Sequence, residues 1–265
     1  MAAHIVTTDL AGKKALITGG SRGIGGAIAV ALAQAGASIA IFGRDFESLK
    51  KQQQRLVDYG VDVEIFPCDV LDAEQVSESW AALEAKWGGV DILINNVGGG
   101  GRWGSENILE TPLFTWDEVL RKNLGVAIQL TSACLPFMKS KGWGRVLTVT
   151  SIYGVSIGGR PWFNIAKVAQ TTLTKNLAKN LDFTRNGITF NSIAPGAVFI
   201  EGTGWSEMEK NNPEEFRKFL DSLPLGRMGK PEEVASLALY ICSEQSSYLN
   251  GSSITLDGGE TADLI

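Results

Sequence analysis

The sequence is poor in the residues that most metal sites and many hydrolases require. Its 265 residues include one histidine, His4, and three cysteines. A Ser-His-acid triad and most zinc or iron sites need imidazole, so this composition excludes them and no metal is expected. Cys68, Cys134 and Cys242 are odd in number, widely spaced and embedded in apolar segments. They predict buried free thiols rather than disulfides or metal ligands.

The chain also lacks an excess of positive charge and any long apolar run. Its formal net charge of -5 offers no basic surface for nucleic acid or an anionic membrane, and favours a small-molecule partner. Residues 1–12 lack the apolar core of a signal peptide. No apolar run approaches the roughly 20 residues that a membrane-spanning helix needs. We therefore expect a cytoplasmic protein with no membrane partner.

Apolar, β-branched runs alternate along the chain with segments of helical periodicity. This alternation predicts a parallel sheet covered by helices on both faces, the doubly wound, Rossmann-like α/β fold. No repeat or linker interrupts it, so residues 1–265 are expected to form one domain, with a substrate lid at residues 197–229. The expected strands are residues 15–18, 38–42, 63–66, 91–95, 145–150, 188–193 and 253–256, and the expected helices are residues 24–34, 46–59, 73–86, 115–139, 162–181 and 231–243, with a short helix at 212–220 in the lid.

The first expected strand runs directly into a glycine-rich loop and then into an alanine-rich helix. Glycines permit a tight turn and a close backbone approach to a ligand, while the helix N-terminus faces the pyrophosphate of a dinucleotide. The order strand, loop, helix and second strand therefore predicts dinucleotide binding. The loop reads Gly19-Gly20-Ser21-Arg22-Gly23-Ile24-Gly25.

Two arginines indicate which dinucleotide is preferred. Enzymes that choose NAD place an acidic residue about 20 positions after the glycines, whereas an arginine there accommodates the 2′-phosphate of NADP. Arg44 stands at this distance, and Arg22 in the loop supplies a second cation for the same phosphate. A solvated surface arginine is the alternative interpretation, and Asp45 beside Arg44 is the feature that favours NAD. We expect NADP(H).

Three further motifs join the loop in resembling the short-chain dehydrogenase/reductase (SDR) family over residues 13–260. They are similar to the family's adenine contact, its Asn-Asn-Ala-Gly motif and its nicotinamide contact, and read Asp69-Val70, Asn95-Asn96-Val97-Gly98 and Pro195-Gly196-x-Val198 respectively. The resemblance implies a sheet in the order 3-2-1-4-5-6-7 and a homotetramer or homodimer. The cofactor-binding residues it implies are Gly19, Ser21, Arg22, Gly23, Ile24, Gly25, Arg44, Asp69, Val70, Asn96, Gly98, Lys167, Pro195, Gly196 and Val198.

The resemblance also implies catalytic residues, with one departure from the family pattern. Asn123, Ser151 and Lys167 stand where the family has its catalytic asparagine, serine and lysine. The family's tyrosine lies four residues before the lysine, one helical turn away, where the ammonium lowers the phenol pKa. Here that position is Phe163. A benzene ring has no exchangeable proton, so Phe163 can shape the pocket but cannot be the acid.

Tyr153 is the candidate replacement for the missing phenol. The stretch Thr150-Ser151-Ile152-Tyr153, with Lys167 fourteen residues later, resembles the 2,4-dienoyl-CoA reductases, as does the ending Asp257-Gly258-Gly259-Glu260. That group also lacks the tyrosine before the lysine and uses one near this strand end. In regular strand geometry, side chains two apart share one face, which would aim both the serine and the tyrosine at one substrate oxygen. The alternative for Tyr153 is pocket lining.

The leading hypothesis is an NADPH-dependent reductase of a ketone or 3-oxoacyl substrate. Ser151 and Tyr153 would stabilise the oxyanion or donate the proton, Lys167 would hold the ribose, and Asn123 would support a water relay. One alternative is an enoyl or dienoyl thioester reductase, and another is an NADP(H)-binding protein without turnover. Aromatic side chains are predicted either to line an apolar substrate pocket or to belong to the core or an interface. They are Trp103, Trp162, Phe199 and Trp205.

Overall fold

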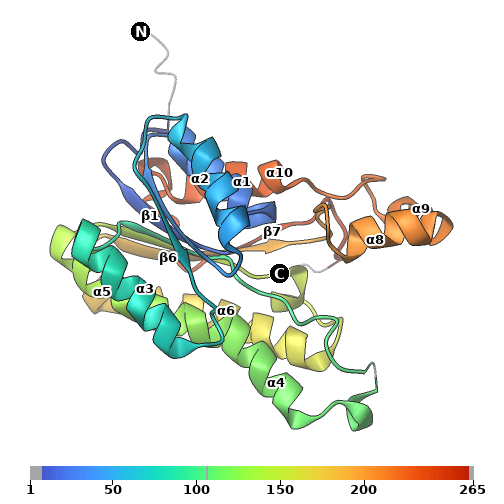
Figure 1. Ribbon diagram of the computed structural model, residues 1–265. Helices are drawn as coiled ribbons and strands as arrows, with labels where there is room; N and C mark the ends of the chain where they lie inside the picture. The colour runs from blue at the N-terminus through green and yellow to red at the C-terminus, as the bar shows by residue number, and fades with distance from the viewer. Residues whose placement is uncertain (1–7, 106, 263–265) are drawn as a thin grey trace, which may run out of the picture.

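The protein is a parallel sheet of seven strands between two layers of helices, in a computed structural model that describes residues 8–105 and 107–262 (Figure 1). The strand order β3-β2-β1-β4-β5-β6-β7 confirms the expected Rossmann-like, doubly wound α/β fold. His4 lies outside the described residues. The strands are β1 Lys14–Thr18, β2 Ser38–Gly43, β3 Val63–Pro67, β4 Ile92–Asn95, β5 Gly144–Val149, β6 Ile188–Pro195 and β7 Ser253–Leu256.

Helices cover both faces of this sheet. Helices α1, α2 and α10 pack on one face, and α3, α5 and α6 on the other (Figure 1). Parallel strands need such crossovers, because the chain must return to the same edge of the sheet before the next strand begins. The helices are α1 Gly23–Gln34, α2 Phe46–Val57, α3 Ala73–Trp87, α4 Leu113–Leu120, α5 Val126–Lys141, α6 Pro161–Leu177, α7 Leu181–Thr184, α8 Gly204–Asn211, α9 Pro213–Ser222 and α10 Pro231–Ile241.

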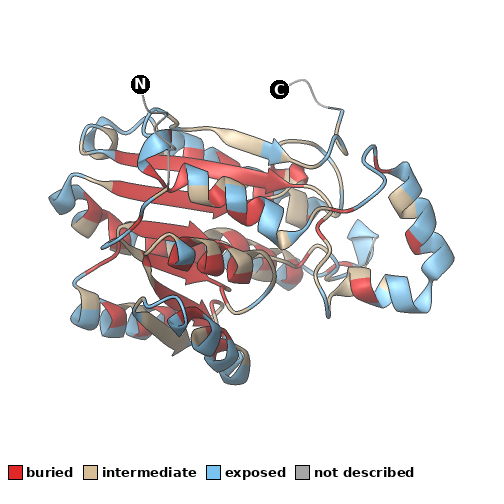
Figure 2. Cartoon of the chain, turned by 90° about the horizontal axis from the view of Figure 1, so that it is seen from above, coloured by how far each residue is buried: buried red, intermediate tan, exposed pale blue. Residues whose placement is uncertain are grey.

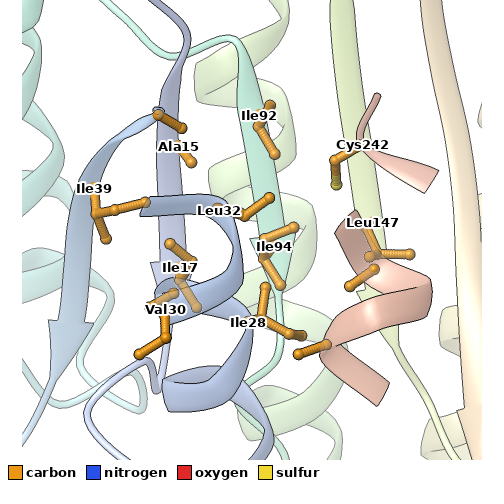
Figure 3. Packing of buried hydrophobic residues seen from close by; sticks show 14 of the residues in the cluster. Ala15, Ile17, Ile28, Val30, Leu32, Ile39, Ile92, Ile94, Leu147 and Cys242 are labelled. Atoms are coloured by element: carbon orange, nitrogen blue, oxygen red, sulfur yellow. The ribbon is translucent and has the colours of Figure 1, made fainter. Parts of the chain in front are cut away.

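The core consists of two apolar layers separated by the sheet. Neighbouring residues of a strand point to opposite faces, so Ile17 packs in one layer and Leu16 in the other, both without solvent exposure. Ile28 and Leu32 of α1 lie over Ile94 of β4 (Figure 3). Burial is concentrated in the central strands and the inner helix faces (Figure 2). The packing of the core therefore fixes the positions of the carboxyl ends of the strands, where doubly wound sheets bind ligands.

The helix expected at residues 115–139 is interrupted in a way that the sequence did not reveal. Between α4 and α5 lies a π-helical segment, Arg121–Gly125, which contains Asn123. Its backbone hydrogen bonds span five residues, since the N–H of Val126 donates to the carbonyl of Arg121. Such π-bulges insert one residue into an α-helix and occur often at functional sites. Here the insertion turns the Asn123 carbonyl toward α6.

Two more helical segments compare with their predictions as follows. The helix expected at 162–181 ends at Leu177, and the short α7 follows it. The short helix expected at 212–220 is present as α9, but α8, which precedes it and meets it at Asn212, was not predicted. Pro213 begins α9, and proline suits the first turn of a helix because it has no N–H to donate. A periodic pattern alone does not detect such a junction.

Residues 197–229 contain a small apolar cluster of their own, separate from the two main layers. Phe216, Leu223 and Met228 are buried in it. Trp205 of α8 stacks on Phe219 of α9, with ring centroids 4.4 Å apart. Helices α8 and α9 lie beside the end of the sheet and outside the helical layers (Figure 1). The function of this segment as a lid stays a prediction.

Candidate active site

One large cavity opens along the carboxyl ends of the strands, where doubly wound sheets bind ligands. Its volume is about 1120 Å³. Its wall includes nearly all of the cofactor-binding residues predicted from the sequence. Those that line it are Gly19, Ser21, Arg22, Gly23, Ile24, Arg44, Asp69, Val70, Asn96, Gly98, Lys167, Pro195, Gly196 and Val198.

The glycine loop has the geometry of a phosphate cradle. Gly19 and Gly23 have φ angles of 66° and 56°, a region that favours glycine. Gly25 does not line the cavity, but a Cβ there would collide with the Asn96 amide and with the carbonyl oxygen of Gly19. The Asn96 Nδ2 donates to the carbonyl of Thr18 over 2.9 Å, which ties the loop to the end of β4. These contacts thus fix the shape of the loop at the N-terminus of α1.

Arg22 and Arg44 both line the cavity, and the structure explains the acidic residue beside them. Asp45 is the N-cap of α2, and its Oδ1 accepts a hydrogen bond from the Ser48 N–H over 2.8 Å. Hydrogen bonds from the Ser48 side chain and backbone hold the pKa of the Asp45 carboxyl below its usual range. Because this carboxylate caps a helix, the residue pair fits a 2′-phosphate better than a ribose hydroxyl.

Lys167 is buried and lies in a chain of hydrogen bonds. Its Nζ donates to the Val149 carbonyl over 3.2 Å and to Gln170 Oε1 over 2.9 Å. Gln170 Nε2 then donates to the backbone carbonyl of Asn123 over 2.8 Å. Burial lowers the pKa of Lys167 to about 7. Gln170 was not among the predicted site residues, although its place three residues after Lys167 puts both on one helix face.

Asn123 is fully buried behind the cavity wall. Its Nδ2 donates to the carbonyls of Val119 over 2.7 Å and of Gly99 over 2.9 Å. These bonds hold the loop that follows β4 against the π-helical segment. The asparagine therefore supports the wall of the cavity and offers its backbone carbonyl, rather than its side chain, to α6.

The predicted serine and the phenylalanine line the cavity, whereas Tyr153 is outside the set of lining residues. The Lys167 Nζ lies 5.7 Å from the centroid of the Phe163 ring. Tyr153 packs edge-on to Phe163, with ring centroids 6.4 Å apart. Gly159 lies against the Tyr153 ring, where a Cβ would be 3.0 Å from Cε2. Tyr153 thus neighbours the site through Phe163.

The expectation that Ser151 and Tyr153 share one strand face is wrong. Strand β5 ends at Val149, and residues Ile152–Gly154 form a 3₁₀ turn. The Ser151 hydroxyl oxygen caps this turn by accepting a hydrogen bond from the Tyr153 N–H over 3.2 Å. The turn therefore sets the direction of the tyrosine, and strand alternation does not apply to it.

The predicted aromatic residues divide between the cavity and the core. Trp205 lines the cavity, whereas Trp162 is fully buried with Val119. Phe199 packs in the cluster of the 197–229 segment, and Trp103 packs beside the Trp162 cluster. One of the four thus lines the cavity, and contact of Trp205 with a substrate stays a prediction.

Two cations that the sequence analysis did not single out also line the cavity. Arg102 lies beside Trp205, with its guanidinium carbon 5.6 Å from the ring centroid. Lys122 Nζ lies 4.4 Å from the centroid of the Trp103 ring. Lys122 directly precedes Asn123 in the sequence, whereas Arg102 belongs to no motif and only the tertiary structure brings it to the site.

The remaining composition-based predictions concern metals, thiols and membranes. The three cysteines are buried and free, as predicted. Within residues 8–105 and 107–262, no three His, Cys, Asp or Glu side chains are grouped so that they could hold a metal ion. Over the same residues, no helix combines the length and apolarity needed to cross a bilayer.

Comparison with known proteins places the chain in a family. The model of the enoyl-(acyl carrier protein) reductase family matches residues 19–261. The chain is 35% identical over 253 residues to a 3-oxoacyl-[acyl-carrier-protein] reductase of Aquifex aeolicus, covering 94% of this chain and 98% of that protein. It is 33% identical over 258 residues to gluconate 5-dehydrogenase of Gluconobacter oxydans, covering 97% of each. The chain belongs to the short-chain dehydrogenase/reductase family.

Solved structures agree with this assignment. The L-sorbose reductase of Gluconobacter frateurii, in complex with NADPH and L-sorbose, superposes with a TM-score of 0.88 at 31% identity, covering 97% of this chain and 100% of that one. The RhlG/NADP active-site complex of Pseudomonas aeruginosa gives a TM-score of 0.85 at 32% identity, covering 95% and 97% respectively. Family and fold are thus those predicted from the motifs.

Proposed function

We propose that this protein is an NADP(H)-dependent oxidoreductase that reduces a carbonyl substrate of the ketone or 3-oxoacyl type. The observation that carries the proposal is one continuous cavity with Arg22 and Arg44 in its wall together with Ser151 and Lys167. Relatives that bind NADPH or are described as 3-oxoacyl reductases support the same activity. The homotetramer or homodimer and the cytoplasmic location stay predictions.

The residues divide into a cofactor-holding set and a reacting set. Bound NADPH supplies hydride from the nicotinamide. Arg22 and Arg44 bind the 2′-phosphate through charge-assisted hydrogen bonds, and the N-terminus of α1 faces the pyrophosphate. Lys167 holds the nicotinamide ribose. Ser151 donates a hydrogen bond to the substrate oxygen, which gains negative charge as hydride reaches the neighbouring carbon.

The reaction also needs one proton. The catalytic site is unusual because the position of the family's proton-donating tyrosine is occupied by Phe163. Reduction of a ketone adds hydride to carbon and a proton to oxygen. Phe163 has no proton to give, so we assign the donor role to Tyr153, which lies beside Phe163. An approach of the Tyr153 hydroxyl to the substrate requires a shift of its ring toward the cavity.

Phe163 also favours a second candidate function, reduction of an activated alkene such as an enoyl or dienoyl thioester. Hydride then adds to the β-carbon, and the proton goes to the α-carbon, where water can deliver it. The loss of a phenol matters less for this reaction. The third candidate is NADP(H) binding without turnover. In this case the replacement of the tyrosine by Phe163 has abolished catalysis.

A substrate panel separates the three candidates. NADPH consumption is followed by absorbance with ketones, diketones, 3-oxoacyl thioesters and 2,4-dienoyl thioesters. Turnover of the first three groups supports carbonyl reduction, and turnover confined to the dienoyl thioesters supports alkene reduction. Tight NADPH binding with no turnover on any member supports the binding-only function.

Arg44→Ala is expected to weaken NADPH binding at least about tenfold while leaving NADH binding nearly unchanged. A charge-assisted hydrogen bond to phosphate contributes about 1.5–3 kcal/mol. NADH has no 2′-phosphate, so it does not make this hydrogen bond and loses nothing when Arg44 is replaced. Calorimetric titration of both cofactors measures the effect. Arg55→Ala is the matched control, because Arg55 is exposed on α2 and does not line the cavity. Equal losses for NADPH and NADH would contradict the assignment.

A further inference from the structure

Gln170 occupies the space between the Lys167 ammonium and the Asn123 carbonyl, where the water relay expected at Asn123 would have to lie. It is 1% exposed and lies on α6, one turn after Lys167. Its Oε1 accepts from Lys167 Nζ over 2.9 Å, and its Nε2 donates to the Asn123 carbonyl over 2.8 Å. The Asn123 carbonyl belongs to the π-helical segment, so the Gln170 side chain links α6 to that segment.

A carboxamide at this point behaves differently from water. A water molecule donates and accepts through the same atom, so it can receive a proton on one side and release another. The amide oxygen of Gln170 only accepts and its nitrogen only donates. Passing a proton through the group would require a costly change of tautomer. The link holds Lys167 and Asn123 together but does not conduct protons.

The other contact of the ammonium leads to the same conclusion. In the described part of the chain, the hydrogen bonds of Lys167 Nζ go to the Val149 carbonyl and to Gln170 Oε1. A backbone carbonyl accepts a hydrogen bond but carries no proton to donate. Lys167 also lines the cavity, so its remaining open side faces the cavity.

We propose that Gln170 is a positioning residue that takes the place of a relay water between Lys167 and the Asn123 carbonyl, and so closes a proton path to Lys167 through that water. Lys167 then acts as a fixed holder of the ribose, and the proton that completes each reduction enters from the cavity side. This inference rests on the proposed hydride transfer and adds to it the direction of proton supply. It also accounts for Phe163, since a tyrosine at that position would depend on the path that Gln170 closes.

Crystal structures with NADPH test the closed path without any need for turnover. The wild-type complex is expected to keep both Gln170 hydrogen bonds with no water between Lys167 and the Asn123 carbonyl. Gln170→Ala removes four heavy atoms and makes room for a water, which occupies about 30 Å³ in the liquid. In that variant a water is expected to bridge the two groups. A wild-type complex in which Gln170 swings away and a water bridges them would overturn the proposal.

Kinetics in a Phe163→Tyr background test the consequence for catalysis. There the new phenol must regain its proton after each turnover, so opening the path should matter. The double variant F163Y/Q170A is expected to exceed F163Y in kcat for a ketone by at least about tenfold, within the range of general acid catalysis. The increase should be confined to kcat, with KM for NADPH nearly unchanged. Its solvent deuterium isotope effect should change with it.

The matched control is F163Y/Q170L, because leucine fills similar space without hydrogen bonding to water. It is expected to show no increase in kcat. An equal increase with leucine, or none with alanine, would contradict the proposal, and thermal denaturation verifies that each variant folds. If no variant reduces any substrate, the proposed function fails, while the crystal structures still decide whether Gln170 closes the path.

Discussion

Tyr153→Phe is expected to lower kcat for the carbonyl substrate by about 10²–10⁴-fold, because a positioned general acid contributes that much to a rate. NADPH affinity should change little, since the benefit of the proton donor is confined to the transition state. Tyr153 lies beside Phe163 rather than in the cavity wall, so this variant tests whether the ring reaches the substrate during turnover. Pre-steady-state and steady-state rates with NADPH measure both quantities.

Phe163→Tyr is the control that separates the two positions. In the Tyr153→Phe background it is expected to restore only a small part of the lost rate, because the phenol then stands one turn from Lys167 while Gln170 still closes the proton path behind that lysine. Tyr240→Phe serves as a matched variant, since Tyr240 is exposed on α10 and absent from the cavity wall. An undiminished kcat in Tyr153→Phe would remove Tyr153 from the mechanism and leave Ser151 or water as the source of the proton.

The fold and the cofactor end of the site were predictable because they depend on local patterns. Apolar strands, helical periodicity and a glycine loop each occupy a short stretch, and together they identify a doubly wound sheet. Lys167 and Ser151 were identified because they stand where the family has its catalytic lysine and serine. For these residues, being near a strand end or on one helix face is enough to bring them to the cavity.

The features that were missed depend on contacts between distant segments. Gln170 contacts the Asn123 carbonyl only because α6 packs on the π-helical segment. No local pattern in either segment predicts this contact. The direction of Tyr153 follows from a 3₁₀ turn of three residues, which a strand pattern does not reveal. The status of Asp45 was ambiguous until its hydrogen bond to Ser48 identified it as a helix cap.

Lys167→Met is expected to weaken NADPH binding below about pH 7 and to have a smaller effect above it. Burial lowers the pKa of Lys167 to about 7, so the group carries its charge below this pH and loses it above. Only the charged form attracts the electron-rich hydroxyls and phosphates of the cofactor strongly. In the wild type the Kd for NADPH should therefore rise as the pH increases through 7, and this rise should be absent in the variant.

Calorimetric titrations from pH 6 to 9 measure this dependence. The 2′-phosphate of the cofactor also titrates, with a second pKa near 6, but it does so with both proteins and cancels in their difference. Methionine preserves much of the lysine stem and deletes the charge. A wild-type Kd that follows the variant in parallel across the whole range would place the ammonium away from the cofactor.

The same pKa predicts the sign of a stability difference without any ligand. The unfolded chain holds the Lys167 proton up to its usual pKa of 10.5, whereas the folded chain releases it near 7. Between these values the unfolded state binds more protons, so the free energy of unfolding rises with pH. Relative to Lys167→Met, the wild type should gain thermal stability as the pH rises from 7 to 10, and below 7 the difference should level off. Calorimetric unfolding of the two proteins measures it, and a difference that does not vary with pH would mean that Lys167 keeps an ordinary pKa in the fold.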